Sequence, residues 1–217
     1  MLKLRFGDSK DALRNILCLG AHCDDIEIGC GGTILRLIEE NPKLEFCWVV
    51  FSSTAERKRE AREAARLFLG PRTKARVVIR SFRDSFFPYQ GKAIKEFVES
   101  IRRSFQPDLI FTHGRGDLHQ DHRLISELTW NAFRDHLILE YEIPKYDGDL
   151  GSPNVFVGFD EPLCRRKIGN ILRAFRSQAR KQWFTEETFR AILRIRGIES
   201  NAEGKYAEGF YCRKGLV

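Results

Sequence analysis

Short apolar runs alternate with helical patterns along the first 133 residues of this 217-residue chain. Each run is strand-sized and rich in branched residues, and the segment after it repeats its apolar side chains every three or four positions. Such alternation predicts a parallel sheet covered by helices on both faces. We therefore expect an α/β fold, a three-layer α/β/α Rossmann-like arrangement with a mostly parallel, doubly wound sheet in a single domain. The expected strands are 15–20, 44–51, 76–79 and 107–112, and the expected helices include 53–69, 91–105 and 123–133.

The pattern becomes less regular after residue 137. A Gly- and Asp-rich loop is expected at 144–153 and a strand at 154–159, and two helices and a short strand at 206–212 then close the chain. We expect 1–217 to form one domain, in which 137–217 faces the substrate and could also contact a second copy in a homo-oligomer.

The composition indicates where the protein is located in the cell and what kind of partner it could bind. Its longest apolar runs are strand-sized and its N-terminus lacks the apolar core of a signal peptide, so we expect a cytoplasmic protein without a transmembrane segment. None of its six cysteines forms a Cys-x-x-Cys pair, which favours reduced thiols. The net charge of +7 permits an anionic partner, but acidic residues accompany the basic ones on helices, as at 56–63.

Polar clusters follow two of the predicted strands. The first is Ala-His-Cys-Asp-Asp at 21–25, and the second runs from His113 through Asp-Leu-His-Gln-Asp-His at 117–122. Four of the five histidines lie in or beside these clusters. Because open α/β sheets place their ligands at the carboxyl ends of strands, the two clusters could form one site.

The residue types in the clusters suit a hydrolytic metal site. A catalytic zinc ion typically takes three protein ligands from histidine and carboxylate and leaves a position for water, whose pKa falls to about 7. His22, Asp25 and His122 offer such a set, and either zinc or ferrous iron would suit it. Asp24 then remains as a general base, and His119 could donate to the oxyanion or protonate the leaving amine.

Several further residues are candidates for supporting or substrate-binding roles. Asp117 and Asp121 are suited to orienting imidazoles from behind, since histidine ligands usually donate their other ring N–H to a carboxylate. Arg57 and Arg115 could bind a sugar hydroxyl or a phosphate, although solvated arginines are common. His113 alone is more often a hydrogen-bonded histidine at a strand end than a ligand.

Four motifs resemble those of the PIG-L (LmbE-like) deacetylases. Residues 21–33 resemble the Ala-His-Pro-Asp-Asp signature of that family, and 119–122 resemble its His-Pro-Asp-His signature. Residues 206–210 resemble its Tyr-Ala-Glu-x-Phe ending, and 57–60 its Arg-x-x-Glu helix. The resemblance implies a zinc-dependent enzyme that removes acetyl from an N-acetylated amino sugar. It also implies site residues: the metal ligands His22, Asp25 and His122, the base Asp24, and the acid or oxyanion partner His119 with Asp121 behind it.

The chain departs from the family pattern in two places. Cys23 stands where the family usually has proline, and it is either a small packed side chain or an oxidation-sensitive thiol beside the metal. The loop at 52–55 is shorter than the Gly-Glu-containing loop common in the family, which leaves the substrate class open.

Three functions therefore remain as hypotheses. The first is a metal-dependent N-deacetylase that acts on an N-acetylglucosamine-type group in a glycoside, glycolipid, sugar nucleotide or polysaccharide precursor. The second is a metal-dependent amidase or phosphoesterase on another substrate. The third, a non-enzymatic nucleic-acid-binding module, rests on charge alone, so we expect no nucleic-acid partner.

Overall fold

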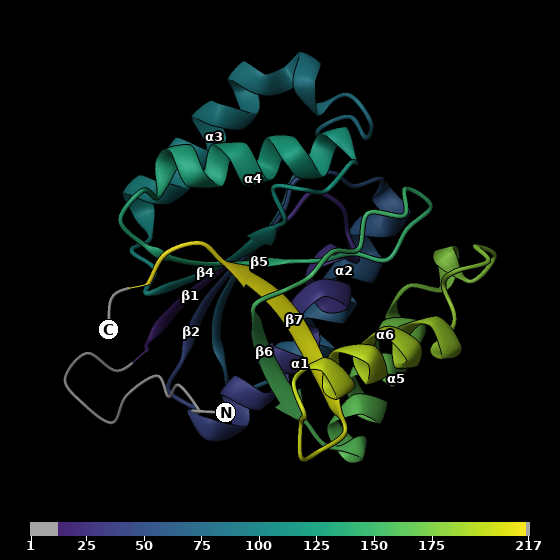
Figure 1. The fold of residues 1–217 in the computed structure, drawn as a ribbon. Coiled ribbons are helices and arrows are strands. Elements are labelled where there is room, and N and C mark those ends of the chain that lie inside the picture. Colours follow the sequence, from purple (N-terminus) through teal and green to yellow (C-terminus); the bar gives the residue numbers. More distant parts are fainter. Residues whose placement is uncertain (1–12, 216–217) are drawn as a thin grey trace.

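The computed structural model describes residues 13–215, in which seven strands form one sheet in the order β3-β2-β1-β4-β5-β7-β6 (Figure 1). The first five strands run parallel, and β7 lies antiparallel between β5 and β6. The strands are β1 (Asn15–Gly20), β2 (Glu45–Val50), β3 (Lys74–Ile79), β4 (Leu109–His113), β5 (Leu137–Tyr141), β6 (Val155–Phe159) and β7 (Tyr206–Cys212).

Helices cover both faces of the sheet, which confirms the expected three-layer fold. Figure 1 shows α3 and α4 on one side of the sheet, and α1, α2, α5 and α6 on the other. The helices are α1 (Asp25–Glu40), α2 (Ala55–Leu69), α3 (Gly91–Ser104), α4 (Gln120–Ala132), α5 (Glu161–Ala174) and α6 (Glu186–Glu199), with short 3-10 turns η1 (Phe87–Gln90) and η2 (Arg176–Gln178). None of the helices within residues 13–215 combines the length and the apolar character that a membrane crossing needs.

Two apolar cores form because successive side chains of a strand point to opposite faces. Ile16 and Cys18 of β1 pack into the core beneath α1, α2 and α5, while Leu17 and Leu19 pack into the core beneath α3 and α4. A strand that is buried on both faces reads as a continuous apolar run, as β1 does.

Strand β5 is an element that the sequence pattern did not indicate. It pairs with β4 along its length, and its residues are buried apart from the half-buried Leu137. Its one acid, Glu140, is fully buried because Arg213 donates to it at 2.6 and 2.8 Å and Trp130 at 2.6 Å. These partners come from other elements, so the local pattern around Glu140 could not reveal a buried strand.

Helix α1 begins at Asp25 and packs against the sheet through its glycines. A Cβ atom on Gly29 would lie 2.2 Å from the Tyr141 ring in β5, and one on Gly32 would lie 2.7 Å from the Phe159 ring in β6. The glycine-rich segment therefore brings the helix close to the sheet, and with it the carboxylate of Asp25 at the helix start.

Helix α2 begins at Ala55, two residues after the predicted start at residue 53. The N-cap is Thr54, whose hydroxyl accepts a hydrogen bond from the Arg57 N–H at 3.3 Å. The neighbouring hydroxyl of Ser53 donates instead to the Arg80 carbonyl at 2.6 Å. Gly70 follows the last helical residue with a φ of 70°, a backbone conformation that glycine adopts without the steric cost of a Cβ atom.

Candidate metal centre

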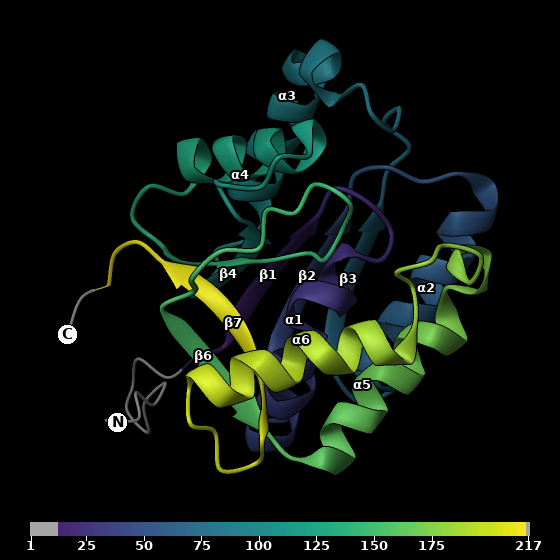
Figure 2. The same ribbon diagram turned by 45° about the vertical axis from the view of Figure 1, so that its right-hand side comes forward.

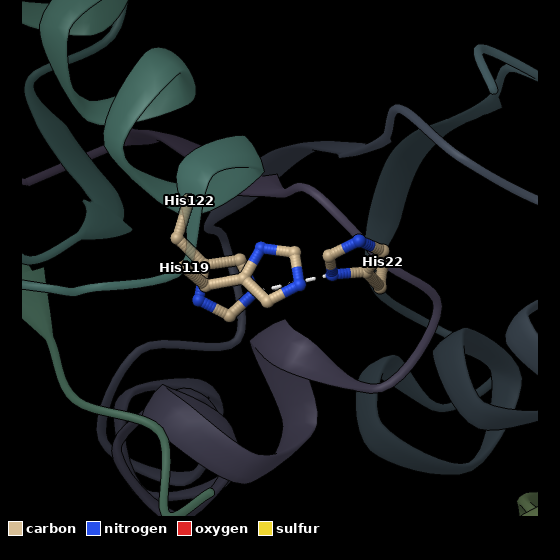
Figure 3. Close-up of side chains that lie close together, drawn as sticks. All are labelled: His22, His119 and His122. Carbon is tan, nitrogen blue, oxygen red and sulfur yellow. Dashed lines mark hydrogen bonds between the residues drawn. The ribbon is translucent and has the colours of Figure 1, made fainter. Parts of the chain in front are cut away.

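The two polar clusters meet at the carboxyl edge of the sheet. Strands β1 and β4 are parallel neighbours, so the loops that follow them adjoin. Figure 3 shows the rings of His22, from the loop after β1, and of His119 and His122, from the start of α4, gathered in one place. The 100 residues between His22 and His122 therefore separate them in sequence but not in space.

The three predicted ligands converge. His22 Nδ1 lies 3.1 Å from His122 Nε2 and 3.5 Å from Asp25 Oδ2, and Asp25 Oδ1 lies 3.6 Å from His122 Nε2. Asp25 and His122 are buried and His22 is half-buried. Two nitrogens and a carboxylate at these separations form a donor set that suits a divalent cation.

The structure offers more potential ligands than the predicted three. Three groups each bring one donor atom per residue within 4.8 Å of one another: His22, His119 and His122; Asp25, His113 and His122; and His22, Asp84 and Asp121. His122 belongs to two of these groups and His22 to two. These two histidines therefore lie at the centre of the constellation.

In both central histidines, the ring nitrogen that points away from the other histidine contacts a carboxylate. Asp117 Oδ2 lies 2.9 Å from His122 Nδ1, and Asp121 Oδ2 lies 3.3 Å from His22 Nε2. This leaves His122 Nε2 and His22 Nδ1 facing each other, the arrangement in which carboxylates orient metal-binding imidazoles. Burial alone would raise the pKa of Asp117, but the hydrogen bond and charge of His122 hold it at about 2.

Asp121 differs from the expectation that it stands behind His119. Its carboxylate is buried and accepts hydrogen bonds from the backbone N–H groups of Ser85 at 2.7 Å and Phe87 at 3.1 Å, while it contacts His22. Towards His119 it offers only its own backbone N–H, which donates to His119 Nδ1 at 3.2 Å. The side chain of Asp121 is therefore directed to His22 and to the segment at the start of η1 rather than to the His119 ring.

Asp24 lies beside the donor set and is held by an arginine. Arg57 Nη2 donates to Asp24 Oδ1 at 2.7 Å, and the guanidinium carbon of Arg57 lies 5.4 Å from the centre of the Phe175 ring. Burial would lower the pKa of Arg57, yet the charge of Asp24 raises it. An ion pair of this kind fixes the direction of the Asp24 carboxylate.

His119 caps the N-terminus of α4 and forms one wall of the site. Its ring centre lies 4.6 Å from that of His122 and 4.9 Å from that of His22 (Figure 3). Burial, together with the nearby His122 and His22, lowers the pKa of His119. A half-buried imidazole beside the donor set can exchange a proton with a bound group.

Two further residues lie beside the predicted ligands. The sequence offered only a weak argument for one of them, His113, and did not single out the other, Asp84. His113 is fully buried, its Nε2 accepts a hydrogen bond from the Ala21 N–H at 3.0 Å, and it lies 3.2 Å from Asp25 Oδ2. Asp84 Oδ1 lies 3.2 Å from His22 Nε2. Asp84 follows the third strand, so the rule that ligands gather at the carboxyl ends of strands could have found it.

Arg115 is turned away from the start of α4. Its guanidinium carbon lies 4.5 Å from the centre of the Trp130 ring, and its Nε lies 3.8 Å from Glu140 Oε1. Trp130 is eight residues beyond His122 in the same helix, which corresponds to about 12 Å along the axis. The structure thus places Arg57 beside the predicted metal ligands, whereas Arg115 lies in a separate group with Trp130 and Glu140.

Cys23 is packed rather than exposed to the site. It is 1% exposed, and its thiol donates to the Ser52 carbonyl at 3.3 Å. Burial raises the pKa of Cys23 to about 12, so the reactive thiolate is scarce at neutral pH. These observations favour the packed side chain over the oxidation-sensitive thiol.

Comparisons with known proteins agree with the fold and the motifs. An uncharacterized deacetylase of Escherichia coli K12, YaiS, is 26% identical over 147 residues, which span 63% of this chain and 77% of that protein. The solved structure of the N,N'-diacetylchitobiose deacetylase from Pyrococcus horikoshii is similar with a TM-score of 0.72 and 24% identity, over 92% of this chain and 84% of that one.

A protein with a different activity, a hydratase, shares the fold equally well. The 4-carboxy-2-hydroxymuconate hydratase GalB from Pseudomonas putida KT2440 matches with a TM-score of 0.74 and 18% identity, over 94% of this chain and 98% of that one. Similarity at this level shows the fold, whereas the reaction depends on the site.

The sequence model of one family matches residues 17–133, which include both polar clusters and more than half of the chain. That family is described as PIG-L, GlcNAc-PI de-N-acetylase. The chain therefore belongs to the PIG-L family of deacetylases.

Proposed function

We propose that this chain is a metal-dependent N-deacetylase that hydrolyses the acetamide of an N-acetylglucosamine-type amino sugar to acetate and the free amine. The observation that carries the proposal is the convergence of His22 Nδ1, His122 Nε2 and the Asp25 carboxylate, with Asp24 beside them. Family membership and the diacetylchitobiose deacetylase among the similar structures support an amino-sugar substrate.

His22, Asp25 and His122 would hold a zinc or ferrous ion, and the donor set fits either one. A divalent ion bound there would lower the pKa of a water molecule and polarise the amide carbonyl. Asp117 and Asp121 would keep the two imidazoles in the orientation that binding requires, through the contacts at 2.9 and 3.3 Å.

The remaining residues would move protons. Asp24, oriented by the hydrogen bond from Arg57, would accept a proton from the attacking water. His119 would donate a hydrogen bond to the developing oxyanion or a proton to the leaving amine. Water adds to the carbonyl carbon, the C–N bond breaks, and the nitrogen leaves as the amine.

The part of the chain beyond residue 137 would border the substrate at two places. Lys145, in the loop after β5, lies 3.1 Å from Asp117, and Ser177 in η2 accepts a hydrogen bond from Arg57 at 3.3 Å. We propose these two segments as the substrate-facing portion of 137–217, with Arg57 as the contact that joins one of them to Asp24.

Acetate release and metal content, measured together, test this function. The Asp24→Asn variant should keep its metal and lose about 10²- to 10⁴-fold in kcat, because it removes the base and leaves the ligands. Glu187→Gln, which removes an exposed carboxylate on α6, is the control and should retain full activity. Retention of activity within tenfold in Asp24→Asn would contradict the assignment of the base. Two metals per chain with phosphate release from a phosphoester would favour the phosphoesterase alternative.

A further inference from the structure

A polar pocket of about 570 Å³ lies between the start of α2 and the turn that follows α5. Figure 2 shows these two segments beside each other. The pocket, called here the arginine pocket, is lined by Glu56, Arg59 and Glu60 of α2, by Arg176 and Ser177 of η2, and by Arg180. Each lining residue carries a polar or charged group.

One side chain connects the arginine pocket to the proposed base. Arg57 donates through Nη2 to Asp24 Oδ1 at 2.7 Å and through Nη1 to Ser177 Oγ at 3.3 Å. Ser177 is in turn fixed by Glu60, which accepts from its N–H at 2.8 Å and from its hydroxyl at 2.7 Å. The side chain of Arg57 therefore lies between Asp24 and a residue that lines the pocket.

Arg59, Arg176 and Arg180 carry unsatisfied positive charge. All three are exposed, and within residues 13–215 their guanidinium groups have neither an ion pair nor a hydrogen bond. One of the two glutamates of the pocket, Glu60, is already bonded to Ser177 and lies 3.4 Å from Arg57. The guanidinium groups remain available, and guanidinium groups match the oxygens of phosphate in geometry and charge.

We propose that the arginine pocket binds a phosphate group of the substrate, so that the enzyme acts on an amino sugar whose N-acetyl group and phosphate belong to one molecule. This inference rests on the proposed deacetylase function, because it assigns the second half of the same substrate. The acetamide lies at the metal centre, and the phosphate lies beyond Arg57 against Arg59, Arg176 and Arg180.

Paired substrates test the pocket. The wild-type protein, the triple variant Arg59→Gln/Arg176→Gln/Arg180→Gln and the control Arg103→Gln are compared on N-acetylglucosamine 1-phosphate and on methyl N-acetylglucosaminide. Arg103 is an exposed arginine on α3, on the other side of the sheet. Glutamine keeps most of the length and polarity of arginine and removes its charge.

The wild-type protein should deacetylate the phosphorylated sugar with a kcat/KM at least tenfold above that for the methyl glycoside, and the triple variant should lose this preference. The rate on the methyl glycoside should stay within about twofold in all three proteins. A wild type without the preference, or a triple variant that keeps it, would overturn the proposal.

A binding measurement separates failure of the pocket from failure of the deacetylase function. Calorimetric titration of N-acetylglucosamine 1-phosphate into the same three proteins should show at least tenfold weaker binding to the triple variant and unchanged binding to Arg103→Gln. Binding should also weaken as salt is added. If no substrate releases acetate while this binding pattern holds, the reaction assignment is wrong and the phosphate site stands. Equal binding by all three proteins, or no binding, would refute the phosphate site itself.

Discussion

Glu208 in β7 ties three elements together, and its replacement by glutamine should destabilise the fold strongly. Its buried carboxylate accepts hydrogen bonds from Lys167 Nζ at 2.5 Å, from the backbone N–H groups of Gly32 at 2.7 Å and Thr33 at 2.6 Å, and from the Thr33 hydroxyl at 2.5 Å. Glu208→Gln removes the negative charge and places an N–H₂ group among donors. Lys167, which is 2% exposed, then loses its charged partner and keeps only neutral acceptors such as the Ile28 carbonyl.

The expected cost follows from the uncompensated buried ammonium. Removing one partner of a buried ion pair costs about 3–5 kcal/mol. A typical unfolding free energy is about 5–15 kcal/mol, so the loss is a large part of the total. For a domain of about 200 residues, each kcal/mol shifts the Tm by about 2–4 °C, which predicts a fall of about 6–20 °C.

Urea unfolding followed by circular dichroism measures the cost, with a chelator present so that metal binding does not contribute. Glu63→Gln, which removes an exposed carboxylate paired with Arg66, is the control and should leave the transition midpoint unchanged. The double variant Lys167→Met/Glu208→Gln should regain much of the lost stability, because no charge is left unpaired. A Glu208→Gln protein within about 1 kcal/mol of the wild type would refute this reasoning.

Two further predictions concern the site. Asp117→Asn should weaken metal affinity by about 10- to 100-fold, because it replaces the carboxylate that orients His122. Competition with a chromogenic chelator measures the affinity, and an unchanged value would show that the contact does not orient His122. Because burial holds the pKa of Cys23 at about 12, a thiol reagent at pH 8 should modify the half-buried Cys212 and spare Cys23 in the native protein. Peptide mass spectrometry detects the modified residues, and rapid labelling of Cys23 would contradict its packing against Ser52.

The sequence alone predicted the three-layer architecture and the family to which the chain belongs. The strands at 15–20 and 206–212 have the expected bounds, since a run of branched or aromatic residues is a local signal. The rule that parallel strands carry ligands at their carboxyl ends predicts that His22, Asp25 and His122 meet, and the structure places their polar atoms within 3.6 Å of one another.

Only the tertiary structure decided which partner each polar group takes. Glu140 is buried in β5 because Arg213, 73 residues away, donates to it, and no local pattern contains that information. The Asp121 carboxylate contacts His22, which is 99 positions away in the sequence, whereas only its backbone N–H contacts the nearby His119. The arginine pocket likewise joins α2 to η2, about 120 residues later. Periodicity along the chain reports which face of an element is buried, whereas ion pairs and pockets depend on where distant elements meet in space.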